Sequence, residues 1–416
     1  MILLVFRRKM PARLCGQRIY PLHKSYRINC TTSYAILEEG MLFSKKCDRI
    51  KNRTAAKGRQ RNLKKNRRIL MKYPKSLPDG GTIGFVAPSF GCSIEPYKSA
   101  FNNAQKKFKK LGYQLQLGPN CYEGRGIGIS NTPELCGKEL TESYLGGEND
   151  AIISCGGGEL MCEILDFVDF DKIREAEPKW YTGYSDNTNF TFLLTTLCDV
   201  ASVYGPCAGT YGMEPWHPSV QDAFDLMTGK KNTVSGYDGW EKESLKDAEH
   251  PLVPYNITEK RVLKVYDPAT GTISENGTAD ISGRLIGGCL DCLDNLVGTK
   301  FDKVADFAEK YKNEGILWFL EACDLNVMSI RRAVWQLEHS GWFKYTKGFL
   351  IGRPLCMGQE MMGLDHYTAV TGVLGKYNVP IILDADVGHF APMMPLVCGS
   401  YANIKVQGNE IQIEMK

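Results

Sequence analysis

Residues 180–188 read Trp-Tyr-Thr-Gly-Tyr-Ser-Asp-Asn-Thr, a segment that combines the end of a strand, a turn and the start of a helix. Its apolar start predicts a strand over 179–182, the glycine and serine predict a turn, and a helix is predicted over 187–197. The same order recurs outward along the chain. Further strands are predicted at 82–87, 113–117, 151–154 and 201–204, with helices over 97–111, after the cap Thr132-Pro133, up to Phe167 and from Asp171. This alternation predicts an α/β fold with a parallel sheet covered on both faces, which binds ligands at the carboxyl ends of its strands.

The second half of the chain reads differently. Residues 205 to about 280 are rich in charge, aromatics and turn formers, which predicts a linker with functional loops. From Ile281 on, the sequence predicts strands at 316–320, 348–351 and 381–383, a helix over 327–339 and a hairpin around Gly408-Asn409. The domains expected from these patterns are a basic leader (1–70), an N-terminal domain (71–245), a linker (246–280) and a C-terminal domain (281–416).

Composition excludes several classes of protein. The chain has 416 residues, of which 43% are apolar and 24% charged, which fits two or three globular domains. No run of eighteen apolar residues is present, so a membrane-spanning helix is not expected. Fifteen cysteines are few for this length, and with no recognisable signal peptide they indicate the reducing cytoplasm rather than a disulfide scaffold.

Charge divides the chain into two parts. Residues 1–70 carry 19 Lys and Arg against 3 Asp and Glu, whereas residues 71–416 carry 32 against 44. The acidic body disfavours nucleic-acid binding by that part. We interpret the leader as an over-extended start upstream of Met71; the alternatives are a disordered tail that attracts nucleic acid and a transit segment.

Ser185 is a candidate nucleophile because it stands between a strand and a helix, where unpaired backbone N–H groups can hold an oxyanion. The turn is similar to a nucleophile elbow, although Asn187 replaces the second glycine of G-x-S-x-G. The alternative is that Ser185 or Asp186 caps the helix. A second loop, Gly156-Gly157-Gly158, also follows a predicted strand, and could be an oxyanion hole, a phosphate cradle or a tight structural turn.

A serine nucleophile needs a base and an orienting carboxylate. His389 lies on a glycine-bearing loop after a buried strand, whereas the other histidines of the body lie in polar or helical stretches and are expected at the surface. Glu321 ends the strand 316–320, where it needs a partner: a histidine, or an arginine such as Arg353. The C-x-x-C pair Cys289 and Cys292 is interpreted as two buried thiols, and no metal site is predicted.

Taken in order, several motifs of this chain resemble the LD-carboxypeptidase family of serine peptidases, which includes the microcin C immunity proteins. The resemblance runs from about Gly81 to the C-terminus. It rests on Gly84-Phe85-Val86-Ala87-Pro88-Ser89, Gly156-Gly157, Gly183-Tyr184-Ser185-Asp186-Asn187-Thr188, Tyr204-Gly205-Pro206, Gly283-Arg284-Leu285-Ile286-Gly287-Gly288, Gly298-Thr299, Phe319-Leu320-Glu321, Ile351-Gly352-Arg353 and Gly388-His389-Phe390-Ala391-Pro392.

The resemblance implies a flavodoxin-like N-terminal domain and a smaller β-rich α/β C-terminal domain, usually in a cytoplasmic homodimer without a cofactor. It implies that Ser185 is the nucleophile, His389 the base and Glu321 the orienting carboxylate, in a cleft between the domains. The N–H groups of Gly157 and Asp186 would form the oxyanion hole.

The implied substrate is a murein tetrapeptide or a peptidyl- or aminoacyl-nucleotide. Cys155 and Gly158 flank Gly156-Gly157 where murein-cleaving members tend to carry Arg and an aromatic residue, which counts against murein. Gly156, Trp216 and Trp240 would bind substrate. The two tryptophans would stack on a nucleobase, or else pack between the domains. The competing hypotheses are a non-catalytic protein that binds a small ligand on the same fold, and a nucleic-acid-binding protein that acts through its leader.

Overall fold

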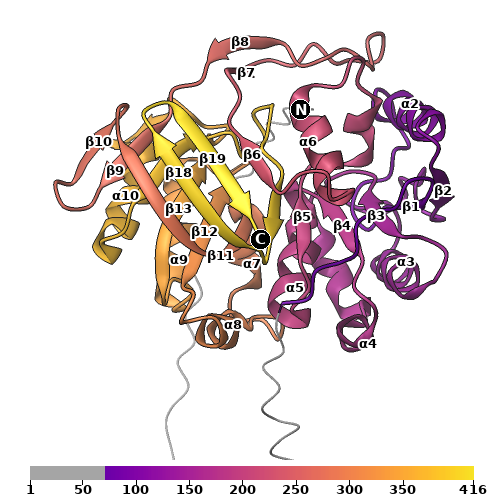
Figure 1. The fold of residues 1–416 in the computed structure, drawn as a ribbon, viewed down its shortest axis with the longest axis horizontal. Coiled ribbons are helices and arrows are strands. Elements are labelled where there is room, and N and C mark those ends of the chain that lie inside the picture. The colour runs from indigo at the N-terminus through magenta and orange to yellow at the C-terminus, as the bar shows by residue number, and fades with distance from the viewer. Residues whose placement is uncertain (1–70) are drawn as a thin grey trace, which may run out of the picture. The chain divides into compact units, whose positions relative to one another are not determined.

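The first sheet of the computed structural model has the strand order β17-β5-β4-β3-β1-β2 (Figure 1). Strands β1 to β5 are parallel in the order 2-1-3-4-5, which is the flavodoxin-like order, and β17 joins the edge antiparallel to β5. The structure describes residues 71–416, so the predictions made for the leader lie outside the described residues. The strands are β1 (Thr82–Val86), β2 (Gln114–Leu117), β3 (Ala151–Ser154), β4 (Trp180–Gly183), β5 (Ser202–Tyr204) and β17 (Leu396–Cys398).

Helices connect these strands because a parallel neighbour can be reached only by a crossover. Thr132 accepts a hydrogen bond from the Leu135 N–H with Pro133 in the first turn, so the predicted helix start is confirmed. Residues 161–167, predicted as the end of a helix, form a 3₁₀ helix instead. The connecting helices are α2 (Tyr97–Lys110), α3 (Pro133–Leu145), η1 (Met161–Phe167), α4 (Phe170–Glu175), η2 (Ser185–Asn187), α5 (Thr188–Cys198), η3 (Ala208–Gly212) and α6 (Pro218–Met227).

The second sheet has nine strands in the order β10-β9-β16-β13-β12-β11-β18-β19-β6. Its centre, from β11 to β16, is parallel, and antiparallel strands extend it on both sides. Its strands are β6 (Thr233–Ser235), β9 (Lys264–Asp267), β10 (Thr272–Ser274), β11 (Thr278–Cys289), β12 (Ile316–Glu321), β13 (Thr346–Gly352), β16 (Ile381–Ala385), β18 (Tyr401–Gln407) and β19 (Glu410–Met415). The smaller elements nearby are β7 (Gly239–Glu241), β8 (Ile257–Lys260), α7 (Leu290–Leu296), α8 (Val304–Lys310), α9 (Val327–His339), β14 (Glu360–Met361), β15 (Leu364–Asp365), α10 (His366–Leu374) and η4 (Gly375–Tyr377).

Helix α5 joins the two sheets. It packs against β5 of the first sheet and against β11 and α7 of the second, and nearly all of its residues are buried. Ser185 begins η2, and η2 continues directly into α5, so the helix that follows the serine turn also packs between the two sheets (Figure 1). The predicted fold class, a parallel α/β sheet with a second sheet-rich part, is confirmed.

Residues 205–280 contain more regular structure than the sequence predicts. Helix α6 and strands β6 to β10 lie in this stretch, and β6 pairs with β19 from the end of the chain. Such short strands carry little signal of their own, because their stability comes from partners far away in the sequence. The predicted domain boundaries stay predictions.

Two global features follow from the described residues. None of the helices in residues 71–416 combines the length and the apolar character that crossing a bilayer requires. The cysteines of the same range are free thiols, and most of them are buried.

Candidate active site

Ser185 lies in the turn between β4 and α5. Its φ is 62°, a left-handed value that is uncommon for a residue with a side chain and is found where a sharp turn presents a functional group. The capping alternative is not what the structure has, because α5 has no side-chain cap. The Asp186 carboxylate instead accepts hydrogen bonds from the Ser89 hydroxyl at 2.5 Å and the Met161 N–H at 2.9 Å.

His389 lies in the loop that leads from β16 of the second sheet to β17 of the first. The preceding Gly388 has φ 115°, and a Cβ there would stand 2.8 Å from Glu321 Oε2, so only glycine lets the loop pass this close. The buried carboxylate of Asp386 anchors the loop, since it pairs with Arg353 and accepts the Tyr237 N–H at 2.9 Å. Arg353 thus pairs with Asp386, and the alternative that it pairs with Glu321 is wrong.

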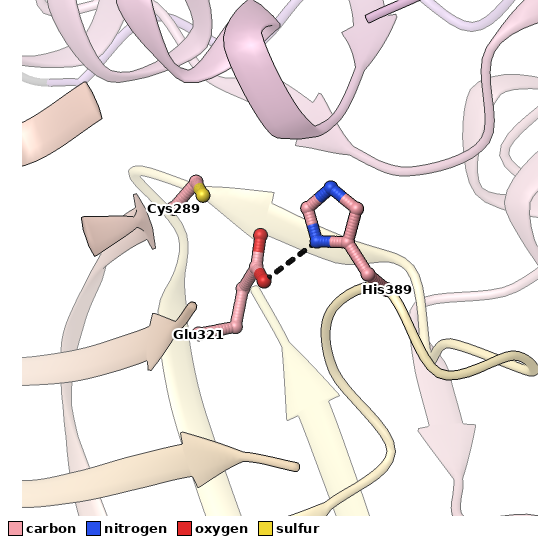
Figure 2. A group of neighbouring side chains, drawn as sticks. All are labelled: Cys289, Glu321 and His389. Atoms are coloured by element: carbon pink, nitrogen blue, oxygen red, sulfur yellow. Dashed lines mark hydrogen bonds and ion pairs between the residues drawn. The ribbon is translucent and has the colours of Figure 1, made fainter. Parts of the chain in front are cut away.

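Glu321 is the last residue of β12 and is buried. Its Oε2 lies 2.9 Å from His389 Nδ1, and His389 Nε2 lies 2.9 Å from Ser185 Oγ. Figure 2 shows the carboxylate facing one nitrogen of the imidazole ring. Side chains from three separate parts of the sequence therefore form one continuous hydrogen-bonded chain.

Burial and mutual attraction shift the pKa values of Glu321 and His389 in opposite directions. Burial would raise the pKa of Glu321, but His389 and hydrogen bonds from His389 and Tyr204 outweigh it and hold that pKa below its ordinary value. Burial would likewise lower the pKa of His389, yet the Glu321 carboxylate outweighs it and raises that pKa well above the ordinary value. The carboxylate is therefore ionised and stabilises a proton on the imidazole.

The glycine loop after β3 approaches Ser185 closely. A Cβ on Gly157 would stand 3.0 Å from Ser185 Cβ and 3.2 Å from Ser185 Oγ, so a side chain there would crowd the serine hydroxyl. The Gly156 carbonyl accepts a hydrogen bond from Asn187 Nδ2 at 2.9 Å, which ties the loop to the serine turn. Within residues 71–416, no acceptor takes a hydrogen bond from the N–H of Gly157 or of Asp186. Both predicted oxyanion donors are unpaired and lie in or beside the serine turn.

Sequence reasoning missed Tyr204 at the end of β5. Its buried hydroxyl donates to Glu321 Oε1 at 2.6 Å and accepts the Ser185 N–H at 3.1 Å. It therefore links the backbone of the serine to the carboxylate of the second sheet. A tyrosine at the carboxyl end of a parallel strand was the available signal, because such ends collect at one edge of the sheet.

Cys289 lies on the other side of Glu321 from His389 (Figure 2). One potential ligand atom from each of Cys289, Glu321 and His389 lies within 4.8 Å of the other two, a set that could hold a cation. The Glu321 carboxylate and the His389 imidazole are hydrogen-bonded to each other. The carboxylate also accepts a hydrogen bond from Tyr204, and the imidazole is hydrogen-bonded to Ser185. Cys289 and Cys292 are buried thiols, as the sequence predicts.

The remaining histidines are less uniform than predicted. His366 is buried at the start of α10, so its expected surface position is wrong, and His217 is half-buried as the cap of α6. The sequence pattern does not reveal this burial, because the residue that faces the imidazole is distant in sequence: His366 Nε2 lies 3.8 Å from Asp384 Oδ1 of β16.

A cavity of about 200 Å³ opens beside His389 and is also lined by Tyr184 and Gly388. Trp216 and Trp240 are not among its lining residues. Trp216 packs against Phe108, Tyr211 and Phe224, and Trp240 packs against Phe390 and Arg353. The structure thus places both indoles in protein contacts, and a stacking role for them stays a prediction.

Two family profiles match the chain. Residues 83–205 match the LD-carboxypeptidase N-terminal domain, and residues 282–404 match the LD-carboxypeptidase C-terminal domain. The microcin C7 self-immunity protein MccF of Escherichia coli is 24% identical over 352 residues, which cover 81% of this chain and 94% of the relative. The probable murein peptide carboxypeptidase of Bacillus subtilis is 26% identical over 351 residues, covering 82% and 94%.

Solved structures share the fold. MccF in complex with glutamyl sulfamoyl guanosine has a TM-score of 0.66 at 21% identity, covering 82% of this chain and 98% of that chain. Muramoyltetrapeptide carboxypeptidase from Oxalobacter formigenes has a TM-score of 0.59 at 20% identity, covering 80% and 98%. With both domain profiles matched in order across more than half of its length, this chain belongs to the LD-carboxypeptidase family.

Proposed function

We propose that the protein is a serine carboxypeptidase or amidohydrolase in which Ser185 is the nucleophile, His389 the general base and Glu321 the orienting carboxylate. The observation that carries this function is the pair of 2.9 Å contacts from Ser185 Oγ to His389 and from His389 to Glu321. A hydroxyl held by an imidazole that is itself held by a carboxylate is the arrangement that activates serine for acyl transfer.

The reaction proceeds in two halves. His389 Nε2 takes the proton of Ser185 as Oγ attacks the amide carbonyl, and the N–H groups of Gly157 and Asp186 bind the oxyanion of the tetrahedral intermediate. The imidazolium then gives the proton to the leaving amine, which departs and leaves an acyl-enzyme. A water molecule, deprotonated by His389, releases the acyl group and restores the serine. Each oxyanion donor contributes about 2.7–4 kcal/mol to stabilising the transition state.

The substrate is an amide at the end of a small molecule: a murein tetrapeptide or an aminoacyl- or peptidyl-nucleotide. Relatives of both kinds support these two candidates, since MccF has been solved with aspartyl sulfamoyl adenosine and a relative of similar fold is a muramoyltetrapeptide carboxypeptidase. A cytoplasmic location and a homodimeric state belong with this function, and the free thiols of the described residues support the first.

Product analysis tests this function directly. The full chain is incubated with murein tetrapeptide and, separately, with aspartyl sulfamoyl adenosine, and the products are identified by mass. We expect release of D-alanine from the first or of aspartate from the second. A protein that binds either compound and leaves both intact would instead be the non-catalytic binding protein.

The Tyr204→Phe variant is expected to lower kcat by about 10- to 100-fold and to change KM little. The substitution removes the donor to ionised Glu321 and the acceptor for the Ser185 N–H, and a hydrogen bond to a charged group contributes about 1.5–3 kcal/mol. Because the Tyr204 side chain is fully buried behind Glu321 and the serine turn, we expect the effect to fall on kcat. Steady-state kinetics measure it, with the exposed Tyr401→Phe as the matched control. Unchanged kcat in a folded Tyr204→Phe protein would contradict a positioning role.

A further inference from the structure

The cavity beside His389 has two walls of different origin. One wall consists of Tyr184, Gly388 and His389, which belong to the catalytic region. The other is the loop between β7 and β8, which contributes Ser244, Lys246 and the segment 253–255. A group that the loop presents into this space therefore meets the same ligand that reaches the imidazole.

Lys246 is the positively charged residue of this loop that lines the cavity. Its side chain is half-buried, and its ammonium lies 5.8 Å from the centroid of the Tyr97 ring. Within residues 71–416, no carboxylate lies close enough to form an ion pair with it. The acid that also lines the cavity, Glu241, directs its carboxylate to the Asn256 N–H at 2.6 Å. Burial lowers the pKa of Lys246, and the attraction of the Glu241 carboxylate offsets this only in part.

The surroundings of the nucleophile are otherwise acidic. Burial raises the pKa of Glu159, and the neighbouring Asp324, Asp186 and Asp291 raise it further. A negatively charged substrate entering such a site is repelled unless a positive group receives it. Among the described residues that line the cavity, Lys246 is the only lysine or arginine.

We propose that Lys246 is an anion-recognition residue that binds a free carboxylate of the substrate beside the scissile amide. This inference rests on the proposed function and narrows its substrate class to compounds with a carboxylate near the cleaved bond. Two sources have that chemistry: the C-terminal carboxylate of a peptide, and the side-chain carboxylate of an acidic aminoacyl group. The Lys246 ammonium could bind either carboxylate. In the half-buried cavity the resulting ion pair would be screened less than in bulk water.

Matched pairs of acid and neutral substrates test the proposal and separate the two sources. The first pair is murein tetrapeptide and its C-terminal amide; the second is aspartyl and asparaginyl sulfamoyl adenosine. We expect the wild-type protein to favour the acid of one pair in kcat/KM, and Lys246→Met to lose about 10- to 100-fold on that acid and little on its neutral partner. Lys246→Arg is expected to restore most of the preference, and the exposed Lys242→Met to leave it intact.

Measuring substrate affinity tests the role of Lys246 without requiring turnover. Calorimetry on a Ser185→Ala background measures the affinity for each acid and its neutral partner, with and without Lys246→Met. Equal losses on acid and neutral substrates, or no loss on either, would overturn the role of Lys246. A wild-type protein that cleaves none of the four compounds overturns the proposed hydrolase function, while the calorimetric difference still decides on Lys246.

Discussion

The Ser185→Ala protein is expected to fold and bind substrate but to turn over roughly 10⁶-fold more slowly than the wild type. Ser185 Oγ has His389 Nε2 as its hydrogen-bond partner, so the substitution removes the attacking atom and disturbs little else. The remaining activity would come from substrate binding and from the oxyanion donors Gly157 and Asp186.

Two measurements check this expectation. Turnover is followed by mass spectrometry of the products, and covalent labelling is followed with a fluorophosphonate, which reacts with an activated serine. The exposed Ser235→Ala serves as the matched control and should keep both properties. Wild-type turnover by Ser185→Ala would rule out a serine acyl-enzyme.

Glu321→Gln is expected to lower kcat by about 10⁴-fold. The amide fills the same buried space but carries no charge, so it no longer stabilises the imidazolium that forms when Ser185 loses its proton. The exposed Glu360→Gln is the matched control and should leave kcat unchanged. Near-normal kcat in Glu321→Gln would show that the carboxylate has only a structural role.

The pH profile gives an independent reading of the same pair. His389 must be neutral to act as a base, and Glu321 raises its pKa well above the ordinary value. Activity should therefore be lost as the pH falls through that raised pKa, so kcat/KM should rise with pH along a limb whose midpoint lies above about 6.5. Removing the charge in Glu321→Gln should move the midpoint to lower pH. A midpoint that does not move would contradict the coupling.

Local sequence signals are sufficient for some elements in or beside the two sheets. The predicted strand 151–154 and helix 327–339 match β3 and α9 residue for residue, because apolar runs and caps decide them locally. Short strands such as β6 were missed, since their pairing partner lies at the other end of the chain. The sequence predicts a surface position for His366 because its own segment does not show that Asp384 of β16 approaches it.

The candidate site divides in the same way. The α/β class, the resemblance to the family and the residues whose chemistry suits acyl transfer follow from the amino-acid sequence, since these depend on local pattern and residue type. The folded chain is needed to see that Ser185, Glu321 and His389 lie within hydrogen-bond distance, that Tyr204 bridges Ser185 and Glu321, and that Arg353 pairs with Asp386 instead of Glu321. The physical reason is that hydrogen bonds and ion pairs act over a few ångströms, and only the packing of two sheets around α5 brings residues so far apart in sequence to that distance.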